Sequence, residues 1–279
     1  MKKLTVILSL FLAAANLHAL KVSDSFFINS DFMRNDLSVV APITTRFAMG
    51  LEASYIDHDD IKDKILMFSA PLVHTDDWMQ ITLSPFATTK ADDLYAFGAS
   101  AHLLLAMENN VVDDKYTQAH LAVSYANQKA DISTDSGDKR KNMGEIGYYL
   151  ALRKNFFNAF FFGVNGSAYQ YTNGISGVNK VKSILDQNQI ANINTFDFIN
   201  QLPKYSVGTT FTRMLEKGAN IYLSYSFIEY YTTRPEHSIL VGNDFPIGKR
   251  FKGDIGYNHI ICRGGSKRDI FRISLSAAF

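Results

Sequence analysis

The last eleven residues of the chain, from Asp269 to Phe279, alternate between apolar and mainly polar side chains. Successive side chains of a β-strand point to opposite faces of a sheet, so a period of two predicts a strand with one apolar face. The chain ends on Phe279, an aromatic residue of that apolar face. The other apolar positions are Phe271, Ile273, Leu275 and Ala277, and the opposite face carries Arg272, Ser274, Ser276 and Ala278.

The start of the chain has the parts of a secretion signal. Lys2 and Lys3 form a basic beginning, an apolar run follows over residues 4–15, and the small residue Ala19 ends a cleavage site. The apolar run is shorter than the roughly 20 residues that a membrane-spanning helix needs. We therefore expect a signal peptide over residues 1–19, cleaved near Ala19, and a mature chain outside the cytoplasm.

Composition narrows the class of the mature chain. The full sequence has 28 Lys and Arg against 27 Asp and Glu, which argues against a nucleic-acid partner because such a partner requires a basic surface. The single cysteine, Cys262, excludes an intrachain disulfide. No long apolar run follows residue 19, so we expect no transmembrane helix. Aromatic residues at 13% and a mean hydropathy of −0.06 suit a β-barrel in a membrane, with a soluble periplasmic β-sandwich as the alternative.

The middle of the chain divides into alternating stretches of roughly 9–14 residues, the length that a tilted membrane strand needs with some overhang. Short and long connections alternate between them, which predicts tight turns at one end of a barrel and longer loops at the other. The clearest strands cover residues 46–56, 94–105, 115–128 and 143–153, and the longest connections are a polar loop at 130–142 and a mixed segment at 172–202.

The strand count depends on residues 22–42. We predict a strand at 22–32, a turn at 33–36 and a returning strand at 37–42, which gives 14 strands in all. If this segment does not span, the count is 12. Both numbers are even and place both chain ends on the same side, as in bacterial barrels.

The aromatic C-terminal strand, the secretion signal and the alternating strands together resemble bacterial outer-membrane β-barrel proteins, and among them the small monomeric porins. The resemblance implies an all-β fold: a closed antiparallel transmembrane β-barrel of residues 20–279 with short periplasmic turns and long extracellular loops. It also implies a monomer with two kinds of partner. One is the lipids of the outer membrane, and the other is the barrel-assembly machinery, which recognises a C-terminal strand that ends on an aromatic residue such as Phe279. No motif of a particular subfamily is present.

If the apolar faces contact lipid, the polar faces line the lumen. A barrel of 12–14 strands lies between side-chain-filled 8-stranded barrels and open porins, which favours a narrow polar channel. Charges of both signs predict weak ion selectivity; the alternative is that they pair and plug the lumen. The predicted lumen-lining residues are Arg46, Glu52, Gln80, His102, Gln118, His120, Glu145, Arg153, Lys204, Lys252, Asp254 and Arg272.

Two histidines stand out among these residues. His102 and His120 lie on strands joined by one hairpin and share its polar face, so we expect them nearly opposite each other. One interpretation is a pH gate or a metal site, since histidine titrates near neutral pH and binds metals. The other is two ordinary polar residues of the lumen, because no third ligand falls at a diagnostic spacing.

Three functions remain open at this point. The first is a passive diffusion channel for small polar solutes or ions. The second is a non-conducting barrel with a structural or surface-binding role through its loops. The third, a lipid-active enzyme, lacks a Gly-x-Ser-x-Gly motif and any nameable set of nucleophile, base and orienting residue. We therefore predict no catalytic residue, no cofactor and no metal-ligand set.

The segment 172–202 is the best candidate for a functional loop, because connections this long are usually functional or disordered. Folded inward it would narrow the pore, and turned outward it would form a surface patch. Within it, residues 178–190 have the spacing of a short amphipathic helix.

Overall fold

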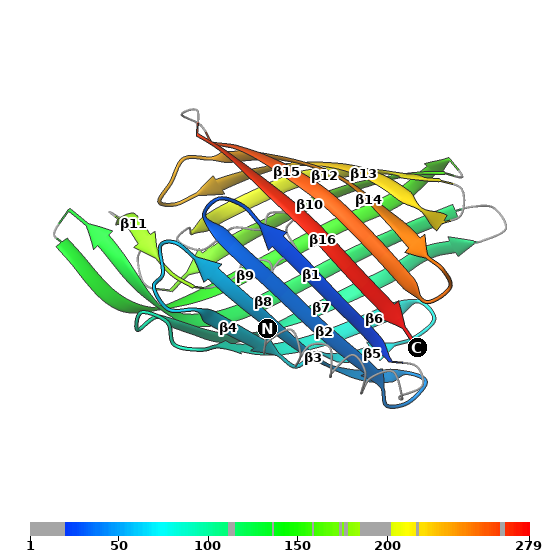
Figure 1. Cartoon of the computed structure of the whole chain (residues 1–279), viewed down its shortest axis with the longest axis horizontal. Helices are drawn as coiled ribbons and strands as arrows, with labels where there is room; N and C mark the ends of the chain where they lie inside the picture. Colours follow the sequence, from blue (N-terminus) through cyan, green and yellow to red (C-terminus); the bar gives the residue numbers. More distant parts are fainter. Residues whose placement is uncertain are drawn as a thin grey trace.

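The chain forms a closed antiparallel β-barrel in the computed structural model (Figure 1). The structure describes residues 20–110, 115–135, 137–157, 159–172, 175, 178–184, 202–215, 218–262 and 266–279. The predicted signal peptide, residues 1–19, lies outside this range. No helix in the described part of the chain is long and apolar enough to cross a membrane.

The barrel closes where the first and last strands meet. Strand β1 (Lys21–Ile28) pairs with β16 (Lys267–Ala278) in an unbroken antiparallel register from Lys21 opposite Ala278 to Ile28 opposite Phe271. Closure removes the sheet edges that a hydrocarbon environment would leave without hydrogen-bond partners. The strands that follow β1 are β2 (Phe32–Pro42), β3 (Phe47–His58), β4 (Ile65–Ser69), β5 (Leu72–Thr75), β6 (Met79–Thr88), β7 (Tyr95–Asn110) and β8 (Lys115–Thr134).

The second half of the wall runs back to β16, and every neighbouring pair in it is antiparallel. Strand β9 pairs with both β8 and β10, which joins the two halves into one continuous sheet. The strands of this half are β9 (Gly137–Phe157), β10 (Phe160–Tyr171), β12 (Pro203–Met214), β13 (Asn220–Tyr230), β14 (Glu236–Ile247) and β15 (Phe251–Cys262).

Strands β4 and β5 are two halves of one barrel strand. Both pair with β3 on one side and β6 on the other, and the break between them falls at Pro71. Proline has no N–H to donate to a ladder, so it interrupts a central strand. The carbonyl oxygen of Pro71 still accepts a hydrogen bond of 2.7 Å from the N–H of Gly50. The wall of the described chain therefore contains 14 strands, which confirms the larger of the two predicted counts.

The two ends of the barrel differ in their connections, as the sequence predicts. One end carries the connections after β2, β5, β7, β9, β12 and β14, together with Leu20 and the C-terminal Phe279, whose N–H donates to the Leu20 carbonyl over 2.9 Å. The other end carries the longer connections at residues 59–64, 172–202 and 231–235. We call them the inner and the outer end, by the orientation expected for a barrel of this class.

The predicted first turn is misplaced. The turn lies at residues 29–31, and β2 already begins at Phe32, so residues 33–36 belong to a strand. Asn29 makes the turn, because its side-chain oxygen accepts 2.7 Å hydrogen bonds from the N–H groups of Asp31 and Phe32. Such Asx-turns replace backbone hydrogen bonds with a side chain.

The predicted polar loop at 130–142 is wrong as well. Strands β8 and β9 continue past the outer end of the wall as a long hairpin, which pairs from Ala130 opposite Lys141 to Thr134 opposite Gly137 (Figure 1). Strand β11 (Val178–Lys182) lies on the β8 edge of this hairpin. The first part of the predicted helix at 178–190 is therefore a strand, because the free edge of β8 offers its backbone a partner; residues 185–190 lie outside the described range.

The outward face is apolar around the barrel. Large hydrophobic side chains at the alternate positions predicted to face lipid are exposed on the isolated chain, with Leu51 and Ile273 each 60% exposed. Leaving such a surface in water would be costly, since each Å² of apolar surface costs about 25 cal/mol. The face is suited to lipid acyl chains, and the predicted assignment of strand faces is confirmed there.

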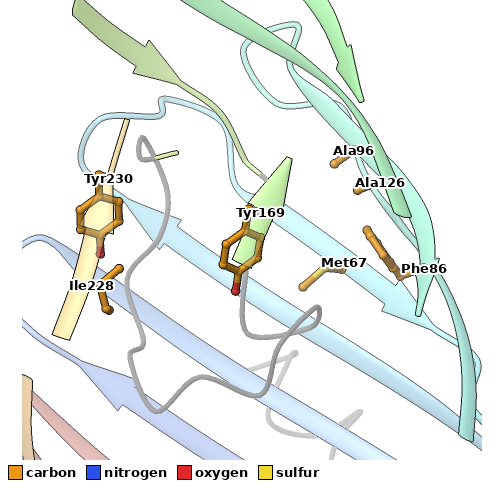
Figure 2. Close-up of a cluster of buried hydrophobic side chains, with 7 residues drawn as sticks. All are labelled: Met67, Phe86, Ala96, Ala126, Tyr169, Ile228 and Tyr230. Carbon is orange, nitrogen blue, oxygen red and sulfur yellow. The ribbon is translucent and has the colours of Figure 1, made fainter. Parts of the chain in front are cut away.

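The inward face changes character along the barrel axis. Near the outer end, many inward positions carry apolar and aromatic side chains that are 0–6% exposed, with buried polar residues such as Gln128 and Glu145 among them. The largest group draws its members from six strands. In Figure 2, Tyr169 of β10 lies between Ile228 and Tyr230 of β13 on one side and the members from β4, β6, β7 and β8 on the other. Its members are Met67, Phe86, Ala96, Ala126, Tyr169, Ile228 and Tyr230.

Candidate functional site: the barrel lumen

A polar cavity of about 460 Å³ occupies the inner half of the lumen. It reaches from the β7–β10 side of the wall, where Gln118 and Asn165 line it, to the β13–β16 side, where Asp244 and Lys252 line it. Residues of these strands point inward because the opposite positions carry the lipid-facing apolar side chains. The cavity therefore lies between two distant parts of the wall.

Charged side chains on the β14–β16 side pair along the wall. Arg272 Nη2 lies 2.7 Å from Asp254 Oδ1, and Lys252 Nζ lies 3.0 Å from Asp244 Oδ1. Each pair joins neighbouring strands, so neither crosses the lumen. The expected pairing of lumen charges is present, and the cavity stays open between them.

Tyr222 holds one of these ion pairs in place. Its hydroxyl donates to Asp254 Oδ2 over 2.9 Å and accepts a hydrogen bond from Arg272 Nη2. The ring can lie against the wall because Gly242 has no side chain: a Cβ there would come within 2.1 Å of the tyrosine oxygen. Gly242 thus leaves the space that Tyr222 occupies.

The opposite side of the wall carries the two histidines. His102 Nδ1 lies 3.2 Å from His120 Nε2, and His102 Nε2 lies 3.0 Å from Ser100 Oγ. The ring of His120 meets Tyr149 edge-on, with centroids 5.1 Å apart, and both residues line the cavity. The expectation that the two histidines face each other is confirmed by this contact.

The described part of the long connection packs against the lumen side of the wall, near the outer end of the barrel. Ile184 is fully buried among Ile56, Ile65 and neighbouring loop residues, and Val181 packs in a second group with Met143. Lys182 Nζ also lies 2.8 Å from Asp92 Oδ2 in the connection between β6 and β7. We call Val178–Ile184 the mouth segment; its burial fits the inward arrangement of the predicted loop.

The predicted lumen residues fall into three groups. Gln118, His120, Arg153, Lys252 and Arg272 line the cavity, and His102 and Asp254 contact residues that line it.

Glu52, Gln80 and Glu145 are at inward positions elsewhere. Glu52 is opposite Ser38 and Ser69, Gln80 contacts Thr82, and Glu145 is fully buried beside Gln128 with 3.4 Å between Gln128 Nε2 and Glu145 Oε2.

The structure does not place Arg46 and Lys204 with the others. Arg46 lies in the turn before β3, where its side chain is 64% exposed and 3.8 Å from Asp76. Lys204 sits at an irregularity of β12 between Pro203 and Tyr205, is exposed, and has its ammonium 5.8 Å from the Tyr231 ring centre. The bulge breaks the alternation on which the prediction for Lys204 depended.

Several inward polar residues were missed, among them Arg34, Tyr222 and Asp244. Arg34, paired with Asp36 at 2.7 Å, falls in the segment that the sequence suggests is a turn. Tyr222 and Asp244 occupy inward positions, but nothing in the alternation distinguishes a residue that lines the cavity from one buried in the wall. Among the described residues, no group of three or more His, Cys, Asp or Glu is arranged to hold a metal ion.

Comparison with known proteins supports the fold. No family model matches the chain, and no curated protein matches it. Among solved structures, the CymD monoaromatic hydrocarbon channel superposes with a TM-score of 0.61 at 9% identity, over 95% of this chain and 90% of its own. OprB of Pseudomonas putida gives a TM-score of 0.50 at 6% identity, over 94% and 93%.

A closed 14-strand barrel with an apolar outer face and a polar inner cavity defines a class. The chain has the fold of outer-membrane porins and channels. Its fold is that of a small porin-like barrel, and no subfamily is identified.

Proposed function

We propose that the chain is a passive diffusion channel of the outer membrane for small polar solutes or ions. The observation that carries this proposal is the 460 Å³ cavity between two distant sides of the wall. A purely structural barrel could fill this space with side chains, as 8-stranded barrels do. The proposed partners are the surrounding lipids and the solutes, and the proposed state is a monomer.

The charges around the cavity support weak selectivity. Arg153, Lys252 and Arg272 line it together with Asp244, and two of the three cations are already paired with carboxylates. Arg153 has its guanidinium 4.9 Å from the centre of the Phe161 ring. Strong selectivity requires rings of one charge, which this cavity lacks among its described lining residues. We therefore expect at most a slight preference for anions.

Recording from the purified protein in a planar bilayer tests the proposal. We expect stepwise conductance with a reversal potential near zero in a salt gradient. Thr210→Trp, which fills the cavity, should lower the conductance of each step. Thr209→Trp is the matched control, since Thr209 is the exposed neighbour on the same strand and faces away from the lumen. A wild-type protein that inserts but never conducts would contradict the channel function.

A second candidate function, surface binding without conduction, is favoured by one observation. The β8–β9 hairpin and β11 extend beyond the wall, where Arg140 contacts Asp131 at 2.5 Å and Asp93 at 3.1 Å. A hairpin pinned in this way can present a fixed surface. If the protein inserts without conducting, and loses attachment to a surface when residues 134–138 are replaced, this second function would stand.

The lipid-active enzyme finds little support near the outer lipid-facing rim. His259 Nδ1 and the Tyr257 hydroxyl both lie 2.6 Å from the same oxygen of Asp269. This arrangement orients a histidine, but no serine or cysteine contacts it among the described hydrogen bonds. Lipid hydrolysis that disappears when one Ser or His is changed would overturn this conclusion.

A further inference from the structure

We propose that His102 and His120 form a binding site for a borderline divalent transition metal, such as Cu²⁺, Ni²⁺ or Zn²⁺, on the lumen wall. The two side chains come from adjacent strands, β7 and β8, and point inward. They are diagonal neighbours, offset by two residues: His102 is opposite Ala122, and His120 is opposite Leu104. The strand pairing fixes their separation, so the site does not depend on a loop.

The spacing of the two ring nitrogens fits a shared metal ion. Imidazole nitrogens bind Zn²⁺ at about 2.0–2.1 Å, which separates neighbouring ligands by about 2.9–3.4 Å for angles between square-planar and tetrahedral. His102 Nδ1 and His120 Nε2 are 3.2 Å apart. In the metal-free protein the same spacing allows one N–H···N hydrogen bond, so the pair is held ready at the required distance.

The surroundings orient each ring for this role. The second nitrogen of a metal-binding histidine usually donates to an oxygen, which fixes the ring and its tautomer. Ser100 Oγ is 3.0 Å from His102 Nε2 and can accept that hydrogen bond, leaving Nδ1 free to bind. The T-shaped ring contact with Tyr149 restrains His120.

The site is open on the side where further ligands must come from solvent. His120 lines the 460 Å³ cavity, so water can complete the coordination shell. Arg153, the charged residue of the neighbouring strand β9 that lines the cavity, has its guanidinium against the Phe161 ring. Two imidazoles and water favour Cu²⁺ over Ni²⁺ and Zn²⁺ in the usual order of affinity, and exclude Mg²⁺ and Ca²⁺, which prefer oxygen ligands.

Metal titration of the detergent-solubilised mature protein, purified without a polyhistidine tag, tests the site. We expect one Cu²⁺ per chain by calorimetry, weaker binding of Ni²⁺ and Zn²⁺, and no heat from Mg²⁺ or Ca²⁺. His102→Gln and His120→Gln should each abolish the site. Ser100→Ala should weaken it about tenfold, as loss of an orienting partner does. These readouts do not depend on conductance, so the proposed channel can fail while the site stands.

His237→Gln is the matched control. This histidine lies on the lipid-facing side with its Nδ1 2.7 Å from the Tyr225 hydroxyl, and its loss should leave the stoichiometry unchanged. Electron paramagnetic resonance of Cu²⁺ bound to the wild-type protein should show splitting from two imidazole nitrogens. This result needs no variant to fold. Splitting from one nitrogen, or unchanged binding in both His→Gln variants, would overturn the proposal.

Discussion

At the scale of single residues, the lumen depends on a glycine that makes room for a tyrosine. Gly242 leaves the space in which Tyr222 lies flat against the wall and connects Asp254 to Arg272. Alternation in the sequence places Tyr222 and Asp254 on the same face, but it contains no information about which cross-strand partners touch. The role of Gly242 appears only when the register of β13 against β14 is known.

We predict that Gly242→Ala narrows the channel. The new methyl group would lie 2.1 Å from the Tyr222 oxygen, so the ring must swing off the wall toward the cavity. Single-channel recording should show lower conductance, and thermal unfolding should show a loss of about 1–3 kcal/mol from the broken hydrogen bonds.

Gly163→Ala serves as the comparison for this variant. Gly163 also lines the cavity, but its new methyl would have its nearest neighbour at 3.5 Å, an ordinary contact. Equal effects of the two substitutions would show that Tyr222 has no special part in the pore.

At the scale of elements, the strands were easier to predict than their ends. Alternation identified the long strands, because one face meets lipid over the whole height of the wall. It failed at 33–36, where four consecutive residues suggested a turn although Arg34 and Asp36 pair on the lumen face. It failed again at 130–142, because the hairpin continues beyond the membrane, where neither face meets lipid and charged residues occupy strand positions.

The mouth segment Val178–Ile184 leads to a prediction about acid pH. The hydrogen bond from Lys182 lowers the pKa of Asp92 below its ordinary value. Because the pKa of Asp92 is depressed in the folded protein, its ion pair with Lys182 is intact above the usual carboxylate pKa of about 3.9. The ion pair is lost as the pH falls through the depressed value. We expect channel opening to increase below about pH 4, by less than about fivefold, since an exposed ion pair contributes about 0–1 kcal/mol.

Asp92→Asn should reproduce this opening at neutral pH. Asparagine tolerates the left-handed backbone that Asp92 adopts, with φ of 50°, so the turn is kept while the charge is removed. Asp93→Asn is the control, since Asp93 has a φ of 67° and pairs with Lys90 and Arg140 instead of Lys182. Single-channel open probability between pH 3 and 7 is the measurement. A wild-type open probability that stays constant over this range would show that the Lys182–Asp92 ion pair does not restrain channel opening.

At the scale of the whole molecule, the closed barrel and its 14 strands could be predicted from the sequence because the surrounding membrane requires the sheet to close. Hydrocarbon requires every strand to be paired, so alternation, an even count and a common side for both termini leave few possible folds. The content of the lumen is not constrained in this way. A lumen whose outer half has apolar side chains such as Tyr169 and Ile228 pointing inward satisfies the same rules as a lumen that is polar throughout.

The junction of the two chain ends gives a prediction for the assembled barrel. Phe279 donates its N–H to Leu20 and packs edge-on against Phe251, with ring centroids 6.4 Å apart. Phe279→Ala should lower the yield of folded barrel in cells, because it removes both this contact and the aromatic end proposed for recognition by the assembly machinery. Gel mobility with and without heating measures the folded fraction.

Refolding the purified variant into detergent separates the two causes. A variant that refolds normally but accumulates poorly in cells would have lost recognition only. Normal accumulation in cells would exclude both contributions.

The β8–β9 hairpin has a consequence for whatever approaches the cell. Lys129 is the last residue of β8 that pairs with β7. The five residues of β8 that follow it, at about 3.3 Å each, extend roughly 17 Å along the strand. An antibody or a phage fibre would therefore meet Lys139 and its neighbours before it met the pore. Antibodies and phages should therefore select for changes in this hairpin, and substitutions at exposed β9 positions such as Lys139, which do not pair with β11, should leave the lumen unchanged.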